Sequence, residues 1–232
     1  MRVAILTGGA GGVGRAVSRQ LRDAGRVVVA LRTVDEAEGD PQPDIQTVRC
    51  DLSDPDACLA AVSEVESTVG KVEILINSLD LCRLKPFHEM SVDDWHDVVN
   101  VNLHSLYNVC RPIIPGMRDR KFGRVVNISS VIGQMGGENQ TSYAASKAAV
   151  IGFTRALALE NARYGITVNA VAPGWIATVA RLGGAGPAAP EPPVGRLGSL
   201  EEVASCVSFL AAEASGFITG ETLNINGGGY LS

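Results

Sequence analysis

The sequence predicts an α/β fold in which a doubly wound, parallel, seven-stranded sheet carries helices on both faces. Three observations predict it. Strand-like and helix-like patterns alternate along the chain, the strand-like runs are almost continuously apolar, and a glycine-rich turn follows the first run. The 232 residues are enough for one large domain and too few for two, so we expect a single three-layer Rossmann domain over residues 1–232.

The expected elements alternate in chain order. The expected strands are residues 3–6, 27–31, 45–49, 73–77, 124–129, 166–171 and 223–226. The expected helices are residues 15–24, 55–69, 91–111, 142–164 and 199–212. Asp54 is a suitable N-cap for the second helix, and Gly70 is a suitable stop. Ser91 is expected to cap the third helix and Ser199 the last, where Glu202 completes a capping box.

Two stretches interrupt this alternation. Residues 32–44 are acidic and contain prolines, so the second crossover is expected to be a loop with at most a short helical turn. Residues 182–198 are rich in Gly, Pro and Ala and cannot form one regular helix. Because this stretch follows the sixth strand at the edge where such sheets bind ligands, we expect a mobile substrate lid at about residues 179–198. A passive linker is the alternative.

Composition excludes several classes of function. The net charge of −5 provides no basic surface for nucleic acid or an anionic membrane. No apolar run is long enough to span a bilayer or to form a signal peptide. The five cysteines are scattered without a C-x-x-C pair, which favours reduced thiols and a cytoplasmic location. His88, His96 and His104 lack metal-ligand spacing, so no metal site is expected.

The turn after the first strand is rich in glycine, and its sequence is Thr7-Gly8-Gly9-Ala10-Gly11-Gly12-Val13-Gly14. It fits G-x-G-x-x-G, which begins at Gly9, and also T-G-x-x-x-G-x-G, which begins at Thr7. Glycines let the backbone approach a pyrophosphate, and the N–H groups at the start of the next helix bind its negative charge. A flexible loop is the alternative, but the strand–turn–helix context favours a dinucleotide site.

One helix carries a phenol and an ammonium group on the same side. Tyr143 and Lys147 are four residues apart and therefore share a face of the expected helix. Ser129 and Ser130 end the fifth strand, and Pro173 begins the segment after the sixth, all at the carboxyl edge of the sheet. A Tyr–Lys pair is common on solvated helices, so the surroundings, rather than the pair alone, indicate a site.

Together these features resemble the short-chain dehydrogenase/reductase family over the whole chain. The matching signatures are Thr7-Gly8 with Gly12-Val13-Gly14, Asp51-Leu52, Asn102, Ser130, Tyr143 with Lys147, Pro173-Gly174, and the tail 219–228. Residues 123–130, 142–148 and the same tail look most similar to 3-oxoacyl-(acyl-carrier-protein) reductases and acetoacetyl-CoA reductases. The resemblance implies that a nicotinamide cofactor transfers hydride to a ketone.

The resemblance assigns roles to a catalytic set of four residues, which are Asn102, Ser130, Tyr143 and Lys147. Tyr143 would protonate the developing alkoxide, and Ser130, with Ser129 as the alternative, would hydrogen-bond the carbonyl oxygen. Lys147 would hold the nicotinamide ribose, and Asn102 would carry a water that refills the proton relay. Because a nearby cation favours a phenolate, we expect Lys147 to lower the pKa of Tyr143.

NADPH is expected rather than NADH. A site for NADH would place an acid at the end of the second strand, where this chain has Ala30-Leu31-Arg32, and Arg15 and Arg32 could pair with a 2′-phosphate. Asp51 and Leu52 would flank the adenine. The full set of expected cofactor-binding residues is Thr7, Gly8, Gly12, Val13, Gly14, Arg15, Arg32, Asp51, Leu52, Asn77, Ser78, Tyr143, Lys147, Pro173, Gly174, Ile176 and Thr178.

One segment departs from the family pattern. Where the family has Asn-Asn-Ala-Gly after the fourth strand, this chain has Asn77-Ser78-Leu79-Asp80. Leu79 is bulkier than alanine, and Asp80 replaces a glycine. We therefore expect backbone strain at a non-glycine position and repulsion between the Asp80 carboxylate and the cofactor phosphates.

Three functions remain open at this point. The first is NADPH-dependent reduction of a 3-oxoacyl thioester on acyl carrier protein or CoA, as in fatty acid biosynthesis. The second is a reductase or dehydrogenase for another ketone or secondary alcohol, such as a polyketide, which the altered residues 77–80 and the short, proline-rich lid favour. The third is a dinucleotide-binding protein with weak catalysis. The resemblance also implies a homotetramer.

Overall fold

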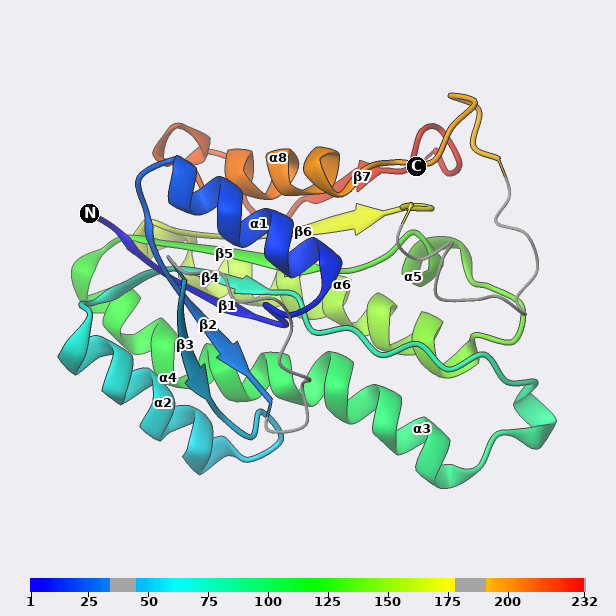
Figure 1. Cartoon of the computed structure of the whole chain (residues 1–232), viewed down its shortest axis with the longest axis horizontal. Coiled ribbons are helices and arrows are strands. Elements are labelled where there is room, and N and C mark those ends of the chain that lie inside the picture. The colour runs from blue at the N-terminus through cyan, green and yellow to red at the C-terminus, as the bar shows by residue number, and fades with distance from the viewer. Residues whose placement is uncertain (34–44, 178–190, 232) are drawn as a thin grey trace.

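The computed structural model describes residues 1–33, 45–177 and 191–231, and it confirms the predicted fold class. Its sheet has seven parallel strands in the order β3-β2-β1-β4-β5-β6-β7 (Figure 1). The strands are β1 Val3–Thr7, β2 Val27–Arg32, β3 Gln46–Arg49, β4 Val72–Asn77, β5 Gly123–Ile128, β6 Ile166–Pro173 and β7 Thr222–Ile225. The strand order reverses between β1 and β4, and doubly wound sheets bind ligands at the carboxyl edge of this switch point.

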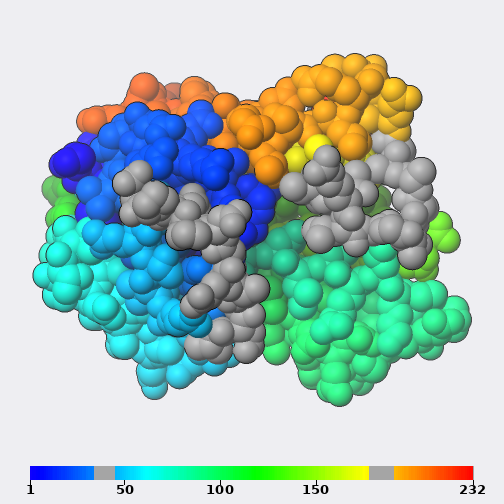
Figure 2. Space-filling model, in the orientation of Figure 1, coloured from blue at the N-terminus to red at the C-terminus, as the bar shows by residue number. Residues whose placement is uncertain are grey.

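Helices cover both faces of the sheet, as predicted. They are α1 Gly12–Asp23, α2 Pro55–Thr68, α3 Val92–Val99, α4 Ser105–Arg120, α5 Ile132–Met135, α6 Thr141–Asn161 and α8 Leu200–Leu210. Shorter helical turns lie at Phe87–Glu89, Asn100–His104, Ala162–Tyr164 and Glu213–Ser215. α1 and α8 pack side by side on one face, where Figure 2 shows them in blue and orange, while α2, α4 and α6 cover the other.

Each face of the sheet has its own hydrophobic core. In β1, Ile5 contributes to the core beneath α2, α4 and α6, whereas Leu6 contributes to the core beneath α1 and α8. In β4, Leu75 and Ile76 alternate in the same way. Successive side chains of a strand point to opposite faces, so strands covered on both faces need apolar residues at every position. This explains the almost continuous apolar runs.

The predicted helix caps are present. The Asp54 side chain accepts a hydrogen bond from a backbone N–H of α2. Ser91 forms a capping box with Asp94 at the start of α3, and Ser199 forms one with Glu202 at the start of α8. Side chains of this kind satisfy N–H groups that the helix itself leaves without partners, so the local sequence was enough to locate these three helix starts.

The third predicted helix is longer than the sequence pattern indicates. The pattern predicts an end at residue 111, but α3, the π-helical turn Asn100–His104 and α4 run on to Arg120, past Pro112 and Pro115. A proline inside a helix removes a backbone hydrogen bond and favours a stop. Here one side of α4 is buried against the sheet, and this packing maintains the helix past both prolines.

Three compositional expectations concern the described residues. The five cysteines are all free, and Cys50, Cys58 and Cys110 are buried. Within residues 1–33, 45–177 and 191–231, no helix is both long and apolar enough to cross a membrane. The same ranges contain no cluster of three His, Cys, Asp or Glu side chains that could hold a metal ion.

Candidate active site

The glycine-rich turn lies between β1 and α1, at the carboxyl edge of the sheet. Gly8 has a φ of 71°, and a Cβ there would lie 2.6 Å from the Ser78 carbonyl oxygen. A Cβ on Gly14 would overlap the Gly8 carbonyl group. The Thr7 Oγ1 accepts a hydrogen bond from the Ser78 N–H at 3.1 Å. Glycine is therefore required at two positions of a turn that contacts the segment after β4 directly.

This turn fits the pyrophosphate of a dinucleotide. α1 begins with Gly12, Val13 and Gly14, and its N-cap is Gly11, which has no side chain to bond the first N–H groups of the helix. The first turn of α1, which lies wholly within the described residues, contains no acidic side chain. The N–H groups and the positive end of the helix dipole therefore face the cradle without a competing negative charge.

The two arginines expected to bind a 2′-phosphate lie against different elements. Arg32 ends β2, where its neighbour in register on β3 is Arg49. Arg15 instead lines a cleft of about 420 Å³ between α1 and α8, together with Leu200 and Glu201. Arg49 is thus a cation beside Arg32 that the sequence motifs did not single out. The sequence could have indicated it, because Arg49 is the last residue of the third strand-like run.

Asp51 and Leu52 follow β3 but differ in exposure. The Asp51 carboxylate accepts hydrogen bonds from the Ser53 N–H at 2.9 Å and the Ser53 hydroxyl at 2.7 Å, and these bonds lower its pKa. Leu52 is buried in the core beside α2. Its side chain is a packing element, so contact between Leu52 and a ligand would have to come from its backbone.

The Asn77 side chain is buried between the sheet and the helices. Its Nδ2 donates to Asn127 Oδ1 on β5 at 2.8 Å, and Asn127 Nδ2 donates to Thr154 Oγ1 on α6 at 2.9 Å. These bonds join β4, β5 and α6. The side chain of Asn77 therefore maintains the frame of the site, while the neighbouring Ser78 contacts the glycine turn through its backbone.

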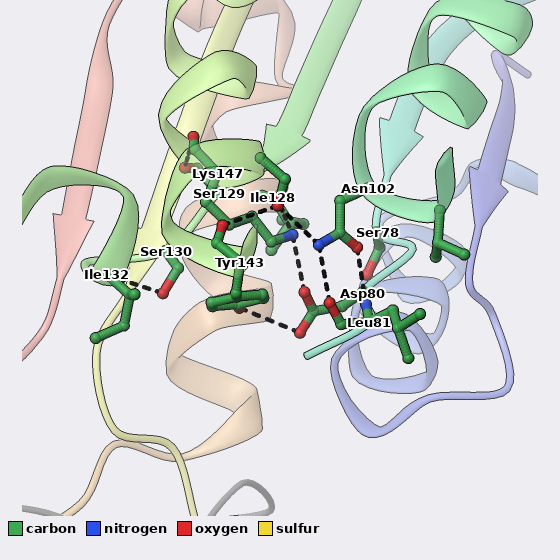
Figure 3. A network of polar contacts seen from close by, with 12 residues as sticks. Ser78, Asp80, Leu81, Asn102, Ile128, Ser129, Ser130, Ile132, Tyr143 and Lys147 are labelled. Carbon is green, nitrogen blue, oxygen red and sulfur yellow. Dashed lines mark hydrogen bonds and ion pairs between the residues drawn. The ribbon is translucent and has the colours of Figure 1, made fainter. Parts of the chain in front are cut away.

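Asn102 fixes the segment that follows β4. It lies in the π-helical turn between α3 and α4, an irregularity that is frequent at functional sites. Its Oδ1 accepts a hydrogen bond from the Leu81 N–H at 2.8 Å (Figure 3). Its Nδ2 donates to the Leu81 carbonyl at 2.9 Å and to Ser146 Oγ on α6 at 3.0 Å. This buried side chain therefore joins the segment to α6.

Tyr143 and Lys147 both contact Asp80 from α6 (Figure 3). The buried Lys147 Nζ donates to the Ile128 carbonyl on β5 at 3.0 Å and lies 2.9 Å from Asp80 Oδ1. The Tyr143 hydroxyl donates to Asp80 Oδ2 at 3.4 Å. One carboxylate, which follows β4, therefore contacts both members of the pair that the sequence singled out.

The expected effect of Lys147 on Tyr143 is wrong. The pKa of the Tyr143 phenol is raised well above its ordinary value, first by burial and then by the charge of Asp80. A hydrogen bond with Ser130 lowers it to a smaller extent. The Lys147 ammonium lies 5.6 Å from the centre of the Tyr143 ring, but its charge is paired with the Asp80 carboxylate. A phenol beside this ion pair is harder to ionise.

Asp80 also differs from expectation in its backbone. Among the described residues other than glycine, only Lys121 and Asn139 have a positive φ. Asp80 therefore takes the place of the family's glycine without left-handed strain, and the predicted strain is wrong. The sequence predicts that the Asp80 carboxylate repels the cofactor phosphates. In the structure this carboxylate contacts Lys147 and Tyr143.

Ser129 and Ser130 have different partners. The Ser129 hydroxyl donates to the Lys147 carbonyl at 2.8 Å, which holds α6 against the end of β5. The Ser130 Oγ accepts a hydrogen bond from the Ile132 N–H at 3.1 Å, and its contact with Tyr143 influences the pKa of that phenol. The geometry therefore places Ser130, rather than Ser129, beside the Tyr143 hydroxyl.

The segment after β6 reaches the same edge of the sheet. Pro173 ends β6, and Gly174 lies so close to the C-terminal segment that a Cβ there would meet a Cα at 2.8 Å. Ile176 is buried in the core on the α1 and α8 face. Thr178 and residues 179–190 of the predicted lid lie outside the described residues.

The described end of the predicted lid is bonded to its surroundings. The Val194 N–H donates to the Gly227 carbonyl at 3.1 Å, and the Gly198 N–H donates to the Trp175 carbonyl at 2.9 Å. Residues 191–198 are thus attached both to the tail after β7 and to the segment after β6.

A dinucleotide-binding oxidoreductase is the class of protein that this fold and site define, because a bare glycine cradle lies at the switch point and a buried Tyr–Lys pair lies at the same edge. The family model described as "Enoyl-(Acyl carrier protein) reductase" matches residues 8–229. The chain belongs to the short-chain dehydrogenase/reductase family, whose members bind NAD(P) and act on C=O or CH–OH groups.

Relatives of established name align over nearly the whole chain. The chain is 42% identical to the acetoacetyl-CoA reductase of Shinella zoogloeoides, with 99% of each chain covered. It is 36% identical to the 3-oxoacyl-[acyl-carrier-protein] reductase FabG of Vibrio harveyi, with 99% of this chain and 98% of the relative covered. A solved structure described as "Crystal structure of gox2181" has a TM-score of 0.92 at 33% identity and covers 98% of this chain and 95% of its own.

Proposed function

We propose that this protein uses NADPH to reduce a 3-oxoacyl thioester, carried on CoA or acyl carrier protein, to the 3-hydroxyacyl thioester. The observation that carries the proposal is the meeting of Tyr143, Ser130 and Lys147 at one edge of the sheet, which combines a proton donor, a second hydroxyl and a cation. The similarity to acetoacetyl-CoA reductases over 99% of the chain supports the substrate class.

The residues present fit the cofactor. The glycine turn and the start of α1 would hold the pyrophosphate, and Lys147 would hold the nicotinamide ribose, as the family resemblance implies. When bound, the nicotinamide supplies the hydride. Pro173 and Gly174 would border it at the end of β6.

Tyr143 would protonate the alkoxide oxygen as the ketone accepts hydride. Its raised pKa keeps the hydroxyl protonated at neutral pH, which is the state that a proton donor needs. The Ser130 hydroxyl would donate a hydrogen bond to the same oxygen and stabilise the negative charge that develops on it. Burial of Tyr143 limits the access of water to this transfer.

Preference for NADPH is supported by the end of β2. Arg32 ends β2, where an NADH site carries an acid, and Arg49 is its partner in register on β3. Guanidinium groups bind phosphate through paired hydrogen bonds, which matches a 2′-phosphate. Arg15 lies on the α8 side of the turn and is the weaker candidate of the two that the sequence offered.

The test is to follow oxidation of NADPH and NADH separately, first with acetoacetyl-CoA and then with acetoacetyl-acyl carrier protein. Rapid turnover with NADPH and slow turnover with NADH are expected, and the preferred carrier identifies the physiological thioester. A protein that binds NADPH but reduces neither thioester would contradict the proposal.

A second candidate is reduction of a different ketone, such as a polyketide intermediate. Asp80 favours it, because a carboxylate at the Tyr–Lys pair changes the charge that an incoming substrate meets. A panel of ketones without a thioester distinguishes the two, since the second candidate predicts that such ketones are reduced faster than acetoacetyl-CoA.

We further propose a cytoplasmic homotetramer in which each chain is one domain with a substrate lid at about residues 179–198. The exposed Tyr107 on α4 and the neighbouring α6 face line a cleft of about 330 Å³, which supports an interface between the long helices of two copies. Light scattering in solution tests the assembly, and a monomer at all concentrations would exclude it.

A further inference from the structure

The carboxylate of Asp80 contacts the two titratable residues of the catalytic set at once. Its Oδ1 lies 2.9 Å from Lys147 Nζ, and its Oδ2 accepts a hydrogen bond from the Tyr143 hydroxyl at 3.4 Å (Figure 3). The Lys147 side chain is 1% exposed and the Asp80 side chain 46%, so a buried ammonium is paired with a carboxylate that still reaches solvent. The glycine of the family pattern offers no group of this kind.

Both contacts favour the protonated form of Tyr143. The hydroxyl can bond Asp80 only as a donor, so ionisation of Tyr143 breaks this hydrogen bond. A phenolate would also lie beside the negative charge of Asp80. The Lys147 ammonium, which alone would favour a phenolate, is already paired with that charge. In agreement with this geometry, burial and then Asp80 are the main causes that raise the pKa of Tyr143.

The position of Asp80 is fixed by its neighbours. Leu81 follows it in the chain, and the Asn102 side chain bonds both the N–H and the carbonyl of Leu81. Asn102 also donates to Ser146 on α6, the helix that carries Tyr143 and Lys147. A short path of hydrogen bonds therefore joins the backbone next to Asp80 to the helix that carries Tyr143 and Lys147.

The other groups around the phenol do not replace this effect. Cys82 comes from the same segment, and burial followed by the charge of Asp80 raises the pKa of its thiol to about 11, so the thiol carries no charge near neutral pH. Ser130 is not titratable, and its hydrogen bond lowers the pKa of Tyr143. The charge of ionised Cys82 also raises the pKa of Tyr143, but less than the charge of Asp80 does, so among the described groups Asp80 supplies the larger negative charge that opposes ionisation of the phenol.

We propose that Asp80 is a positioning residue that keeps Tyr143 protonated and pairs with Lys147, so that the site favours ketone reduction over alcohol oxidation across a wider range of pH. The inference rests on the proposed function, because it concerns the proton of the same reaction. In reduction, the Tyr143 O–H bond breaks, an O–H bond forms on the alkoxide, and solvent returns the proton to Tyr143. Oxidation instead needs a phenolate to remove the proton of the alcohol.

The first test measures the ionisation of Tyr143 in the full chain without cofactor or substrate. Phenolate absorbs in the near ultraviolet, and subtraction of the matching Tyr143→Phe spectrum isolates Tyr143 from the other tyrosines. Asp80→Asn keeps the shape of the side chain and removes its charge. The difference titration is expected to move to lower pH in Asp80→Asn. Asp97→Asn removes a surface carboxylate that pairs with Arg83 at 2.7 Å, and it should leave the titration of Tyr143 unchanged.

The second test compares the two directions of the reaction. At neutral pH the ratio of kcat for alcohol oxidation to kcat for ketone reduction is expected to rise severalfold in Asp80→Asn and in Asp80→Gly. Asp97→Asn should keep the wild-type ratio of the two kcat values. A titration of Tyr143 in Asp80→Asn that superimposes on that of the wild type would overturn the inference, even in an active reductase. Failure to reduce any 3-oxoacyl thioester would remove the proposed substrate, but the titration would still decide the role of Asp80.

Discussion

The Asn102 side chain bonds both backbone groups of Leu81. Its Oδ1 accepts a hydrogen bond from the Leu81 N–H at 2.8 Å, and its Nδ2 donates one to the Leu81 carbonyl oxygen at 2.9 Å. The two bonds attach the segment after β4, which carries Asp80, to the π-helical turn of the long helix. Because Asn102 is buried, its loss would leave backbone groups without partners. Asn102 is thus a structural support for the site.

Asn102→Ala is therefore expected to lower the free energy of unfolding by about 1–3 kcal/mol, the usual penalty for leaving buried polar groups unpaired. Urea denaturation measures this loss. Asn100→Ala provides the control, because Asn100 lies in the same turn but is exposed, and it should change stability by no more than about 0.5 kcal/mol. Equal losses in the two variants would show that the bonds to Leu81 contribute nothing.

The glycine turn provides a matched pair of alanine substitutions. Gly14→Ala forces a Cβ into the Gly8 carbonyl group, so we expect a loss of about 1–3 kcal/mol in stability together with a loss of NADPH binding. Gly11→Ala places its Cβ at an ordinary 3.5 Å from the Gly8 carbonyl oxygen, and the fold should tolerate it. Thermal denaturation and fluorescence titration of NADPH check both. A stable Gly14→Ala variant with normal NADPH affinity would contradict the proposal that the glycine turn binds the cofactor pyrophosphate.

Arg32→Ala is expected to weaken binding of NADPH about ten- to a hundredfold, because a hydrogen bond between charged groups contributes about 1.5–3 kcal/mol. Binding of NADH, which lacks the 2′-phosphate, should remain as in the wild type. Arg15→Ala is the comparison and should have the smaller effect, since Arg15 lies against α8. Equal weakening of both cofactors in Arg32→Ala would refute a phosphate contact.

The raised pKa of Tyr143 predicts the pH dependence of reduction. The phenol remains protonated well into the alkaline range, so kcat/KM for ketone reduction should not fall near neutral pH through loss of the Tyr143 proton. Since the folded pKa lies above the unfolded value of about 10, Tyr143 contributes stability that is present below pH 10 or so and is lost as pH rises through the folded pKa.

Urea denaturation across the alkaline range checks the stability effect, and Tyr143→Phe should remove that part of the alkaline loss. A decrease in kcat/KM for reduction that is centred near neutral pH and persists in a variant of another tyrosine, such as Tyr107→Phe, would contradict the account.

The fold could be predicted almost completely from the sequence. Local rules located the helix starts at Asp54, Ser91 and Ser199, and continuous apolar runs located the strands, since both signals depend on neighbouring residues. The passage of α4 through Pro112 and Pro115 could not be predicted, because long-range burial against the sheet determines it.

The sequence predicted which residues form the candidate site, but it did not predict the contacts between them. Tyr143 and Lys147 were identified from their spacing together with the surrounding family motifs. Their shared partner Asp80 lies more than sixty residues earlier in the chain, and only the folded topology brings the three together. The sequence identified Asp80 as unusual and misjudged its effect, because its contact with Lys147 follows from the path of the segment after β4. Arg49 beside Arg32 likewise depends on strand register, which the sequence pattern does not specify.

The central claim is that Tyr143 donates the proton in ketone reduction, and the most direct test is the NADPH-dependent turnover of acetoacetyl-CoA by Tyr143→Phe. Loss of a general acid predicts a decrease in kcat of about 10²–10⁴-fold, with NADPH affinity close to that of the wild type. Tyr107→Phe, which alters an exposed tyrosine on α4, should retain full activity. If Tyr143→Phe turned over acetoacetyl-CoA at near the wild-type rate, the proposed mechanism would be wrong.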